Sequence, residues 1–339
     1  MPENNSFSPE NPAKPRVLVI VLGGTITMTK SGIGGVEPSL SGIELLGKQP
    51  ELQDIAELEV VSPVLVPSAT LTINDLIAVA DLIQKELAAG IAGAVVVQGT
   101  DTIEETSFLL DLLLDATRPV VVTGAMRPAE AAGADGPANL LASIIVAASE
   151  KAVGYGTLVV LNDEIHAADA VIKGHTALPS AFQSPLTGPL GLIAEGEVRL
   201  YRGGRPGRHP SLSPTKNLEP VALLTISLGD DDRLLRSIPD LGYVGLVIEA
   251  MGAGHVPAGL APQIEVLCKL MPVVLSSRVT TGPIFTRTYG FPGSEIDLIS
   301  RGLIPGGILT GPKARLLLSL ALASGMNKAS LVDLFRQYS

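Results

Sequence analysis

One stretch of the sequence, residues 94–110, constrains the fold more than any other. It opens as an apolar β-branched run, Val95, Val96 and Val97, which is typical of a strand buried on both faces. The run stops at Gly99, and a new apolar pattern begins directly after it. That pattern predicts a helix carrying the residues Ile103, Leu109, Leu110 and Leu113 on its buried side.

Three polar residues, Thr100, Asp101 and Thr102, lie between the predicted strand and helix. Open α/β sheets bind ligands at this position, where free backbone N–H groups and the helix dipole attract negative charge. A structural interpretation is also available, because Thr102 and Glu105 match a capping box and Asp101 is an acceptable N-cap. Taken alone, this turn leaves both interpretations open.

A second turn of the same kind lies near the start of the chain. Residues 16–22 predict a buried strand, and Gly23, Gly24 and Thr25 follow it. Glycine allows a ligand to approach the backbone closely, and a threonine hydroxyl can act as a nucleophile when a base removes its proton. Two such turns in one chain favour the functional interpretation.

Strands and helices alternate along most of the sequence, which predicts an α/β fold with a parallel sheet covered on both faces. Between residues 195 and 220 this pattern gives way to Gly, Pro, Arg and Ser. We therefore expect an N-terminal domain over residues 16–200, a linker over 201–219 and a smaller α/β domain over 220–339. Residues 1–15 are polar and Pro-rich, as in a disordered tail.

Composition argues against several classes of protein. The formal net charge of −10 disfavours nucleic acid or an anionic membrane as the main partner. No apolar run reaches the roughly 18 residues of a membrane span, and the N-terminus lacks the pattern of a signal peptide, so we expect a cytoplasmic protein. The single cysteine, Cys268, excludes an internal disulfide and is expected in the core. His166, His175 and His209 lack metal-ligand spacing.

Lys173 is a candidate base, because partial burial lowers the pKa of a lysine. It follows the apolar pair Val171 and Ile172. A surface lysine whose stem covers apolar residues would show the same pattern. Spacing alone does not connect Lys173 with Thr25, Thr100 and Asp101.

Two motifs resemble a known family. Residues 19–26 resemble the first signature of the bacterial-type L-asparaginase family, and residues 96–106 resemble the second. Shorter matches occur at residues 66–70, 123–128, 134–140, 161–163 and 311–315, and the resemblance covers about residues 16–338. It implies a flavodoxin-like N-terminal domain, a smaller C-terminal domain and a homotetramer built of intimate dimers. It also implies hydrolysis of the side-chain amide of L-asparagine or a close analogue through an acyl-enzyme, without metal or organic cofactor.

The resemblance also implies roles for individual residues. Thr25 matches the nucleophile that attacks the amide carbon, and Thr100, Asp101 and Lys173 match a second triad in which the lysine helps to move the proton. Asp101 also matches a ligand of the substrate α-ammonium. The substrate-binding positions include Ser68 for the α-carboxylate and Ala125 for a backbone contact to the amide. The others are Gly24, Ala69, Gly99 and His255.

The sequence departs from the family pattern in the loop after the first threonine. Members commonly carry a tyrosine there that activates the nucleophile, but residues 27–35 contain none. Activation would then require Lys30, a hydroxyl such as that of Thr29 or Ser31, or water.

Three departures concern the α-ammonium subsite. Ala69 stands where a glutamine is expected, and His255 stands where an asparagine is expected. Residues 277–289, where an acid of the partner subunit is expected, contain no Asp or Glu. Arg287 in this segment would repel an ammonium if it entered a neighbouring site. The sequence therefore predicts an amidase that discriminates weakly for a free α-ammonium.

Three other functions fit parts of the sequence. Residues 252–258 resemble a loose dinucleotide-binding loop, with Ser277 and Arg278 placed to read a 2′-phosphate of NADP. A non-catalytic amino-acid sensor on the same fold would explain the missing loop tyrosine. A subunit of a tRNA-dependent amidotransferase is disfavoured by the acidic composition.

Overall fold

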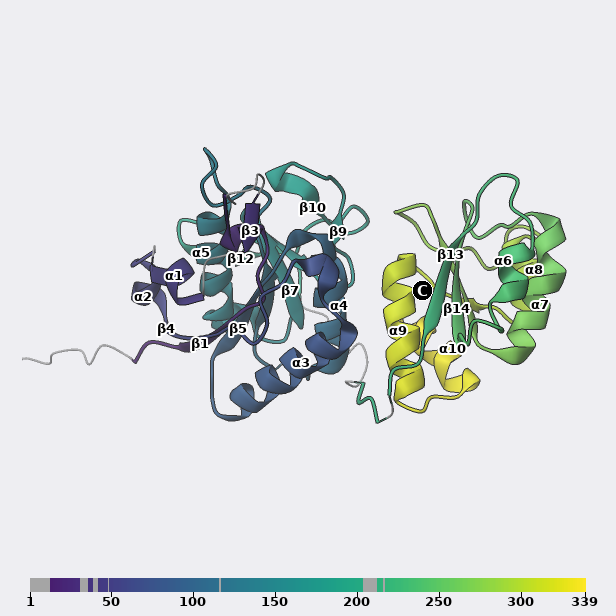
Figure 1. Cartoon of the computed structure of the whole chain (residues 1–339), viewed down its shortest axis with the longest axis horizontal. Coiled ribbons are helices and arrows are strands. Elements are labelled where there is room, and N and C mark those ends of the chain that lie inside the picture. The colour runs from purple at the N-terminus through teal and green to yellow at the C-terminus, as the bar shows by residue number, and fades with distance from the viewer. Residues whose placement is uncertain are drawn as a thin grey trace, which may run out of the picture.

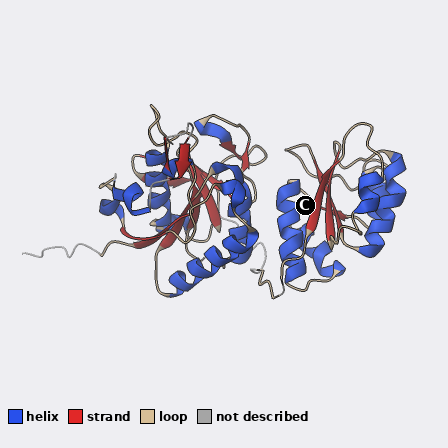
Figure 2. Ribbon diagram, viewed as in Figure 1, coloured by secondary structure: helices blue, strands red, loops and turns tan. Residues whose placement is uncertain are grey.

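The computed structural model describes residues 13–30, 36–38, 42–47, 49–115, 117–203, 212–215 and 217–339. The chain forms two α/β units that lie side by side (Figure 1), and each unit has helices packed against a central sheet (Figure 2). Most of the expected tail, residues 1–12, and much of the expected linker, residues 204–211 and 216, lie outside the described residues. At the start of the described chain, Lys14 Nζ donates to Gln53 O at 2.7 Å.

The first unit contains an eight-stranded sheet in the order β12-β11-β8-β7-β6-β5-β1-β4. Its centre is parallel, as the sequence predicted, and the apolar runs form strands buried on both faces. The parallel strands are β1 (Arg16–Val21), β4 (Glu57–Val61), β5 (Gly93–Val97), β6 (Val120–Thr123) and β7 (Thr157–Leu161).

Helices cover both faces of this sheet. Alternate residues of β1 belong to two different buried clusters: Leu18 and Ile20 pack with the side of α3 and α4, and Val17 and Val19 with the side of α1, α2 and α5. This alternation follows from the period of two in a strand. The helices are α1 (Gly42–Gly47), α2 (Leu52–Ile55), α3 (Ile73–Ala88), α4 (Ile103–Leu113) and α5 (Gly136–Ala147).

Beyond its parallel centre the sheet is mixed, a feature that the sequence analysis did not predict. Three strands extend it in antiparallel pairing: β8 (Glu164–Ala167), β11 (Gly191–Ala194) and β12 (Glu197–Leu200). Two-residue loops create two of these pairings, with φ of 52° at Asn162, 61° at Asp163, 56° at Glu195 and 74° at Gly196. Positive φ at both loop residues is the geometry of a type I′ hairpin, which suits the twist of paired strands.

Short elements surround the carboxyl end of the parallel strands. Two small antiparallel pairs, β2 (Met28–Lys30) with β3 (Val36–Pro38) and β9 (Ile172–Lys173) with β10 (Phe182–Gln183), lie beside it. In the loop expected over residues 27–35, Thr27 ends η1 and Met28–Lys30 form β2, while residues 31–35 lie outside the described part. Short 3₁₀ turns occur at η1 (Thr25–Thr27), η2 (Ser68–Thr70), η3 (Thr100–Thr102), η4 (Glu150–Ala152), η5 (Pro179–Ala181) and η6 (Ala258–Leu260).

The second unit has a smaller, four-stranded parallel sheet, as expected: β13 (Val221–Thr225), β14 (Gly245–Ala250), β15 (Val273–Ser277) and β16 (Ile304–Pro305). Its helices are α6 (Arg233–Ser237), α7 (Ala261–Leu270), α8 (Glu295–Ser300), α9 (Gly311–Ala323) and α10 (Lys328–Arg336). Cys268 on α7 is buried, as predicted, and burial raises the pKa of its thiol to about 11.

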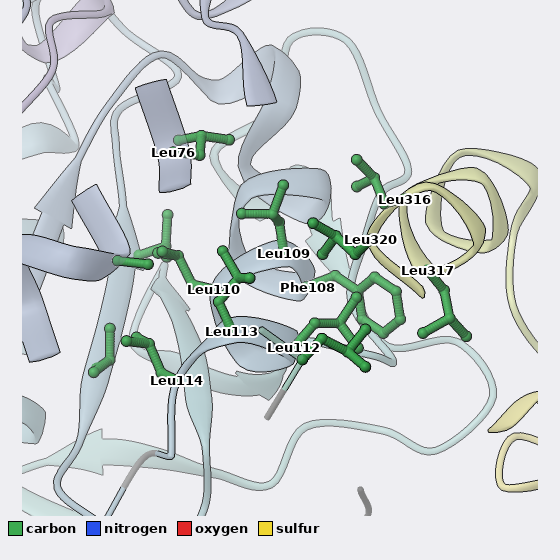
Figure 3. Close-up of a cluster of buried hydrophobic side chains, with 14 of the residues drawn as sticks. Leu76, Phe108, Leu109, Leu110, Leu112, Leu113, Leu114, Leu316, Leu317 and Leu320 are labelled. Carbon is green, nitrogen blue, oxygen red and sulfur yellow. The ribbon is translucent and has the colours of Figure 1, made fainter. Parts of the chain in front are cut away.

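The two units meet through α4 and α9, which form a continuous apolar cluster. Phe108 and Leu112 of α4 lie beside Leu316 and Leu320 of α9 (Figure 3). Each of these side chains is almost fully buried. The described part of the chain contains no helix long and apolar enough to cross a membrane.

Candidate active site

The two glycine-threonine turns lie next to each other because β1 and β5 are neighbouring parallel strands. Leu22 N donates to Val97 O at 2.8 Å, at the point where the two strands end. Gly23 and Gly24 then have φ of 107° and 91°, which side-chain-bearing residues rarely adopt. The turn at residues 23–25 and the turn at residues 99–100 therefore lie at the same edge of the sheet.

Contact between the turns is so close that only glycine fits. A Cβ atom on Gly24 would lie 2.1 Å from the backbone N of Gly99. A Cβ atom on Gly99 would in turn lie 2.5 Å from Ser68 Oγ. Gly99 thus contacts both of the other predicted positions, Gly24 and Ser68. Ala69 follows Ser68 on η2 and is exposed.

Thr100, Asp101 and Lys173 form one hydrogen-bonded group. Lys173 Nζ donates to Thr100 Oγ1 at 3.0 Å and to Asp101 Oδ1 at 2.6 Å. The lysine comes from β9, more than seventy residues along the chain from the threonine, and its side chain is 18% exposed while that of Asp101 is 68% exposed. A lysine in contact with a hydroxyl can exchange a proton with it, and the exposed carboxylate can contact a ligand.

Thr25 begins η1, directly after Gly24, and is partly buried. The turn is stabilised by Thr27, whose N and Oγ1 both donate to Gly24 O, at 2.9 and 2.8 Å. Among the described side chains, no hydrogen bond to the Thr25 hydroxyl is present. The activating groups considered from the sequence, Thr29, Lys30 and Ser31, have side chains outside the described part.

The capping box proposed for Thr102 and Glu105 is not formed, which corrects that expectation. Thr102 is the N-cap residue of α4 but makes no side-chain capping bond. Its hydroxyl accepts instead from Gln98 Nε2 at 3.0 Å and is 3.3 Å from Ser68 O, to which it donates. These bonds tie η3 to η2, so Thr102 holds the two sides of the site together instead of capping the helix.

Ala125 follows β6, the next strand in the sheet, and is fully buried. Its neighbours on both sides are fixed by residues of the 134–140 motif. Asn139 Nδ2 donates to Gly124 O at 3.0 Å, and Asp135 Oδ2 accepts from Met126 N at 2.9 Å. This motif therefore fixes the backbone at Ala125, a role that the sequence analysis did not assign to it.

Glu104 is a second residue that the sequence analysis missed. Its Oε2 accepts from the backbone N of Lys173 at 2.6 Å. Glu104 lies in the first turn of α4, close in sequence to Asp101, where an acidic residue is usually interpreted as a partner of the helix dipole. The available signal was its position beside the polar turn.

His255 is the one predicted site residue that the structure does not join to the others. It lies in the second unit, where its ring packs edge-on against Tyr289 and Phe291. Its Nε2 is 3.3 Å from Glu295 Oε2, although Glu295 is completely buried. Burial raises the pKa of Glu295, but N–H donors of Tyr289 and Thr288 outweigh this and lower it overall.

Glu295 places a carboxylate next to residues 277–289, the segment that contains no Asp or Glu of its own. The segment expected to carry this acid ends at residue 289, but Glu295 Oε1 accepts from the backbone N of Thr288 and Tyr289. Glu295 lies only seven and six residues after Thr288 and Tyr289, so a slightly longer segment would have contained this acid.

The two other histidines that the structure describes, His166 and His175, form hydrogen bonds within the protein. His166 is buried with Nδ1 3.0 Å from Ser184 Oγ, and burial lowers its pKa to about 4. His175 Nδ1 accepts from the backbone N of Ala177, and His209 lies outside the described residues. Within the described ranges no group of three or more His, Cys, Asp or Glu is placed to hold a metal ion.

The loop that resembled a dinucleotide site uses its polar groups internally. Ser277 Oγ donates to Gly252 O at 2.6 Å, and Arg278 donates to Ile226 O at 3.2 Å. A Cβ on Gly254 would lie 3.2 Å from Leu275, so side chains already pack against this glycine. These contacts give no support to nucleotide binding.

Comparison with known proteins agrees with the geometry of the site. Family models match both units: "Asparaginase, N-terminal" over residues 16–204 and "Glutaminase/Asparaginase C-terminal domain" over residues 220–335. The chain belongs to the asparaginase family. The fold and family expected from the two signatures are therefore confirmed.

Relatives of the asparaginase family match almost the whole chain. A probable L-asparaginase of Deinococcus radiodurans is 36% identical over 337 residues, which cover 95% of this chain and 98% of that protein. L-asparaginase 2 of Escherichia coli is 32% identical, over 98% of this chain and 96% of its own. The crystal structure of a probable cytoplasmic L-asparaginase from Campylobacter jejuni is 30% identical with a TM-score of 0.86, covering 96% of this chain and 100% of its own.

Proposed function

We propose that this protein is an L-asparaginase-like amidohydrolase, which converts the side-chain amide of L-asparagine or a close analogue to a carboxylate and ammonia. The observation that carries the proposal is the Thr100–Lys173–Asp101 group, with a lysine Nζ 3.0 Å from a threonine hydroxyl. It lies beside the turn that presents Thr25. Family membership supports the same reaction, because relatives over nearly the full length are named L-asparaginases.

The reaction would proceed in two halves. Thr25 Oγ attacks the amide carbon, and the threonine proton is transferred to the amide nitrogen, which leaves as ammonia with the C–N bond broken. An ester between Thr25 and the substrate acyl group remains. Water then attacks this ester, releases the acid and restores the Thr25 hydroxyl.

The surroundings of Thr25 would lower the barrier in both halves. Backbone N–H groups at the ends of β1 and β5 are suited to stabilise the negative oxygen of the tetrahedral intermediate. Thr100 and Lys173 would carry the proton, since their hydrogen bond connects a hydroxyl with an amine that can accept or return it. Water would connect the Thr25 hydroxyl with this relay.

Substrate orientation would depend on groups that flank the two turns. Ser68 is placed for the α-carboxylate and the exposed carboxylate of Asp101 for the α-ammonium, with Gly24, Gly99 and Ala125 providing backbone contacts. Ala69 adds no polar group, and Ser68 lies directly before it on η2.

Two further properties belong to the same proposal. Self-association to a dimer or tetramer would be a way for His255 and its neighbour Glu295 to reach a second copy's site. Within one chain His255 contacts Glu295, Tyr289 and Phe291. We also assign the activity to the cytoplasm, since the relative from Campylobacter jejuni is named a probable cytoplasmic L-asparaginase. The relative from Haemophilus influenzae is named periplasmic, so location varies between members.

The test is ammonia release from a panel of amides by the purified chain. The panel contains L- and D-asparagine, glutamine, succinamate and an asparaginyl peptide. We expect release from L-asparagine or one of its analogues without added metal or cofactor. A folded protein that binds L-asparagine calorimetrically but releases no ammonia from any compound would instead be a sensor, and the proposal would fail.

A further inference from the structure

We propose that Lys313, a residue of the C-terminal unit, positions Lys173 and so makes the proton relay depend on contact between the two units. The proposal rests on the proposed amidase function. Lys313 belongs to the motif at residues 311–315, to which the site described above assigns no role. Its side chain is 1% exposed, and it lies in the first turn of α9.

The ammonium of Lys313 holds the segment that leads into β9. Its Nζ donates to Val171 O at 2.5 Å and is 3.2 Å from Asp169 O, to which it also donates. Val171 is two residues before Lys173 in the chain. A side chain from one unit therefore fixes the backbone that carries the relay lysine of the other.

Glu104 holds the same short strand from the other side, since its carboxylate accepts from Lys173 N at 2.6 Å. The backbone around Lys173 is thus fixed at both ends of a three-residue segment. The Nζ contacts to Thr100 at 3.0 Å and Asp101 at 2.6 Å depend on this placement. Hydrogen bonds weaken steeply when distance and angle change, so a shift of about 1 Å would break the relay.

Lys313 occupies a position that packing alone does not favour. A cation in the first turn of a helix opposes the helix dipole, and burial of a charge is costly. Burial lowers the pKa of Lys313 to about 8, while the carboxylates of Glu104, Asp111 and Glu105 raise it. The ring of Phe108 on α4 lies 5.9 Å from the ammonium. A methionine would fill similar space without a buried charge, so the ammonium is better explained by its bonds to the 169–171 segment.

The primary test compares Lys313→Met with a packing control on the same helix. Leu320→Ala removes a fully buried side chain of α9 at the same junction (Figure 3), but no polar contact to β9. We expect Lys313→Met to lower kcat for the best amide by about tenfold to a hundredfold and to leave KM within about threefold. Leu320→Ala should lower the melting temperature and leave kcat near wild type.

A second variant separates positioning from stability. Lys313→Met leaves the buried Asp111 without its nearby cation, and the double variant Lys313→Met/Asp111→Asn removes that charge as well. Asp111 Oδ1 accepts from Thr157 N at 2.8 Å, a bond that the asparagine oxygen can keep. We expect the double variant to regain stability but not kcat.

Each outcome decides the proposal. Wild-type kcat in folded Lys313→Met, or kcat restored with stability in the double variant, would overturn the positioning role. An equal loss of kcat in Leu320→Ala would show that domain packing in general, and not Lys313, supports the relay. Should wild type release no ammonia from any amide, the proposed function fails first, and this result is distinct from the other three.

Discussion

The turn after β1 and the turn after β5 have similar sequences but differ in the residues that contact them. Each follows a buried parallel strand, and each passes through glycine to a threonine. Thr100 is only 7% exposed and its hydroxyl accepts a bond from Lys173 at 3.0 Å. Thr25 is more exposed, and no described side chain bonds its hydroxyl.

This difference fits a division of roles between two chemically identical side chains. A hydroxyl already held by an ammonium is oriented and connected to a proton donor or acceptor, as a relay requires. A hydroxyl at the accessible turn beside the β2–β3 pair is free to reach a substrate. Both threonines offer the same hydroxyl chemistry, and the neighbouring Lys173 suits Thr100 to proton transfer and leaves Thr25 for the attack on the substrate.

The largest expected effect is that of Thr25→Ala. If Thr25 is the attacking group, turnover should fall to the level of the uncatalysed background, because no other hydroxyl occupies that position. Circular dichroism and the melting temperature should remain close to wild type, since the hydroxyl makes no described bond. Near wild-type ammonia release by the folded variant would show that Thr25 is not the nucleophile.

Lys173→Met should have the next largest effect. It removes the amine that contacts Thr100 while keeping the length of the side chain, so kcat should fall by about 10²–10⁴-fold, the usual range for a general acid–base group. The melting temperature should change little, because the side chain is partly exposed. A variant that loses much stability but keeps its activity would show that Lys173 has a structural role. Its stem would then serve mainly to cover apolar neighbours.

A pair of glycine variants tests whether the two turns must touch. Gly24 and Gly90 have nearly equal φ, 91° and 90°, but only Gly24 has a backbone neighbour within reach of a Cβ atom. Gly90→Ala should cost roughly 1–3 kcal/mol of stability for strain alone, without loss of kcat. Gly24→Ala should cost more and lower kcat/KM by about a hundredfold, because it pushes Gly99 and hence Thr100 away. Equal stability and activity of the two variants would contradict close contact of the turns.

The smallest expected effect concerns the substrate. With Ala69 in place of a glutamine, kcat/KM for L-asparagine should exceed that for succinamate by less than about a hundredfold, the range that one or two polar contacts supply. Ammonia release from both compounds at matched concentrations measures the ratio. A preference above roughly ten-thousandfold would require additional contacts to the α-ammonium. The His255–Glu295 pair of a second copy would be the leading candidate for them.

Much of the fold could be predicted from local pattern. Runs such as residues 17–21 and 94–97 are apolar throughout, as strands with two buried faces must be, and they became β1 and β5. The antiparallel extension was missed even though Asn162 and Asp163 suit a tight hairpin loop. In the sequence these residues indicated only a family match at residues 161–163, and β8 is too short to show a clear alternation.

The site was predicted less completely, because its contacts join distant parts of the chain. Nothing near Lys173 in the sequence indicates Thr100, and only family resemblance connected them. The capping interpretation of Thr102 failed because Gln98 and Ser68 compete for its hydroxyl in the folded chain. Lys313 shows the limit most clearly, since its partners at Asp169 and Val171 are backbone carbonyls that no residue type reveals.

The most direct test of the central claim is to locate the acyl group during turnover. The enzyme is mixed with L-asparagine, quenched in acid within one turnover, digested and analysed by mass spectrometry, with Thr25→Ala and Thr100→Ala as matched controls. If Thr25 is the nucleophile, an aspartyl ester forms on the peptide that contains Thr25, in wild type but not in Thr25→Ala. An ester on Thr100 instead, or ammonia release in a burst with no ester on either threonine, would contradict it.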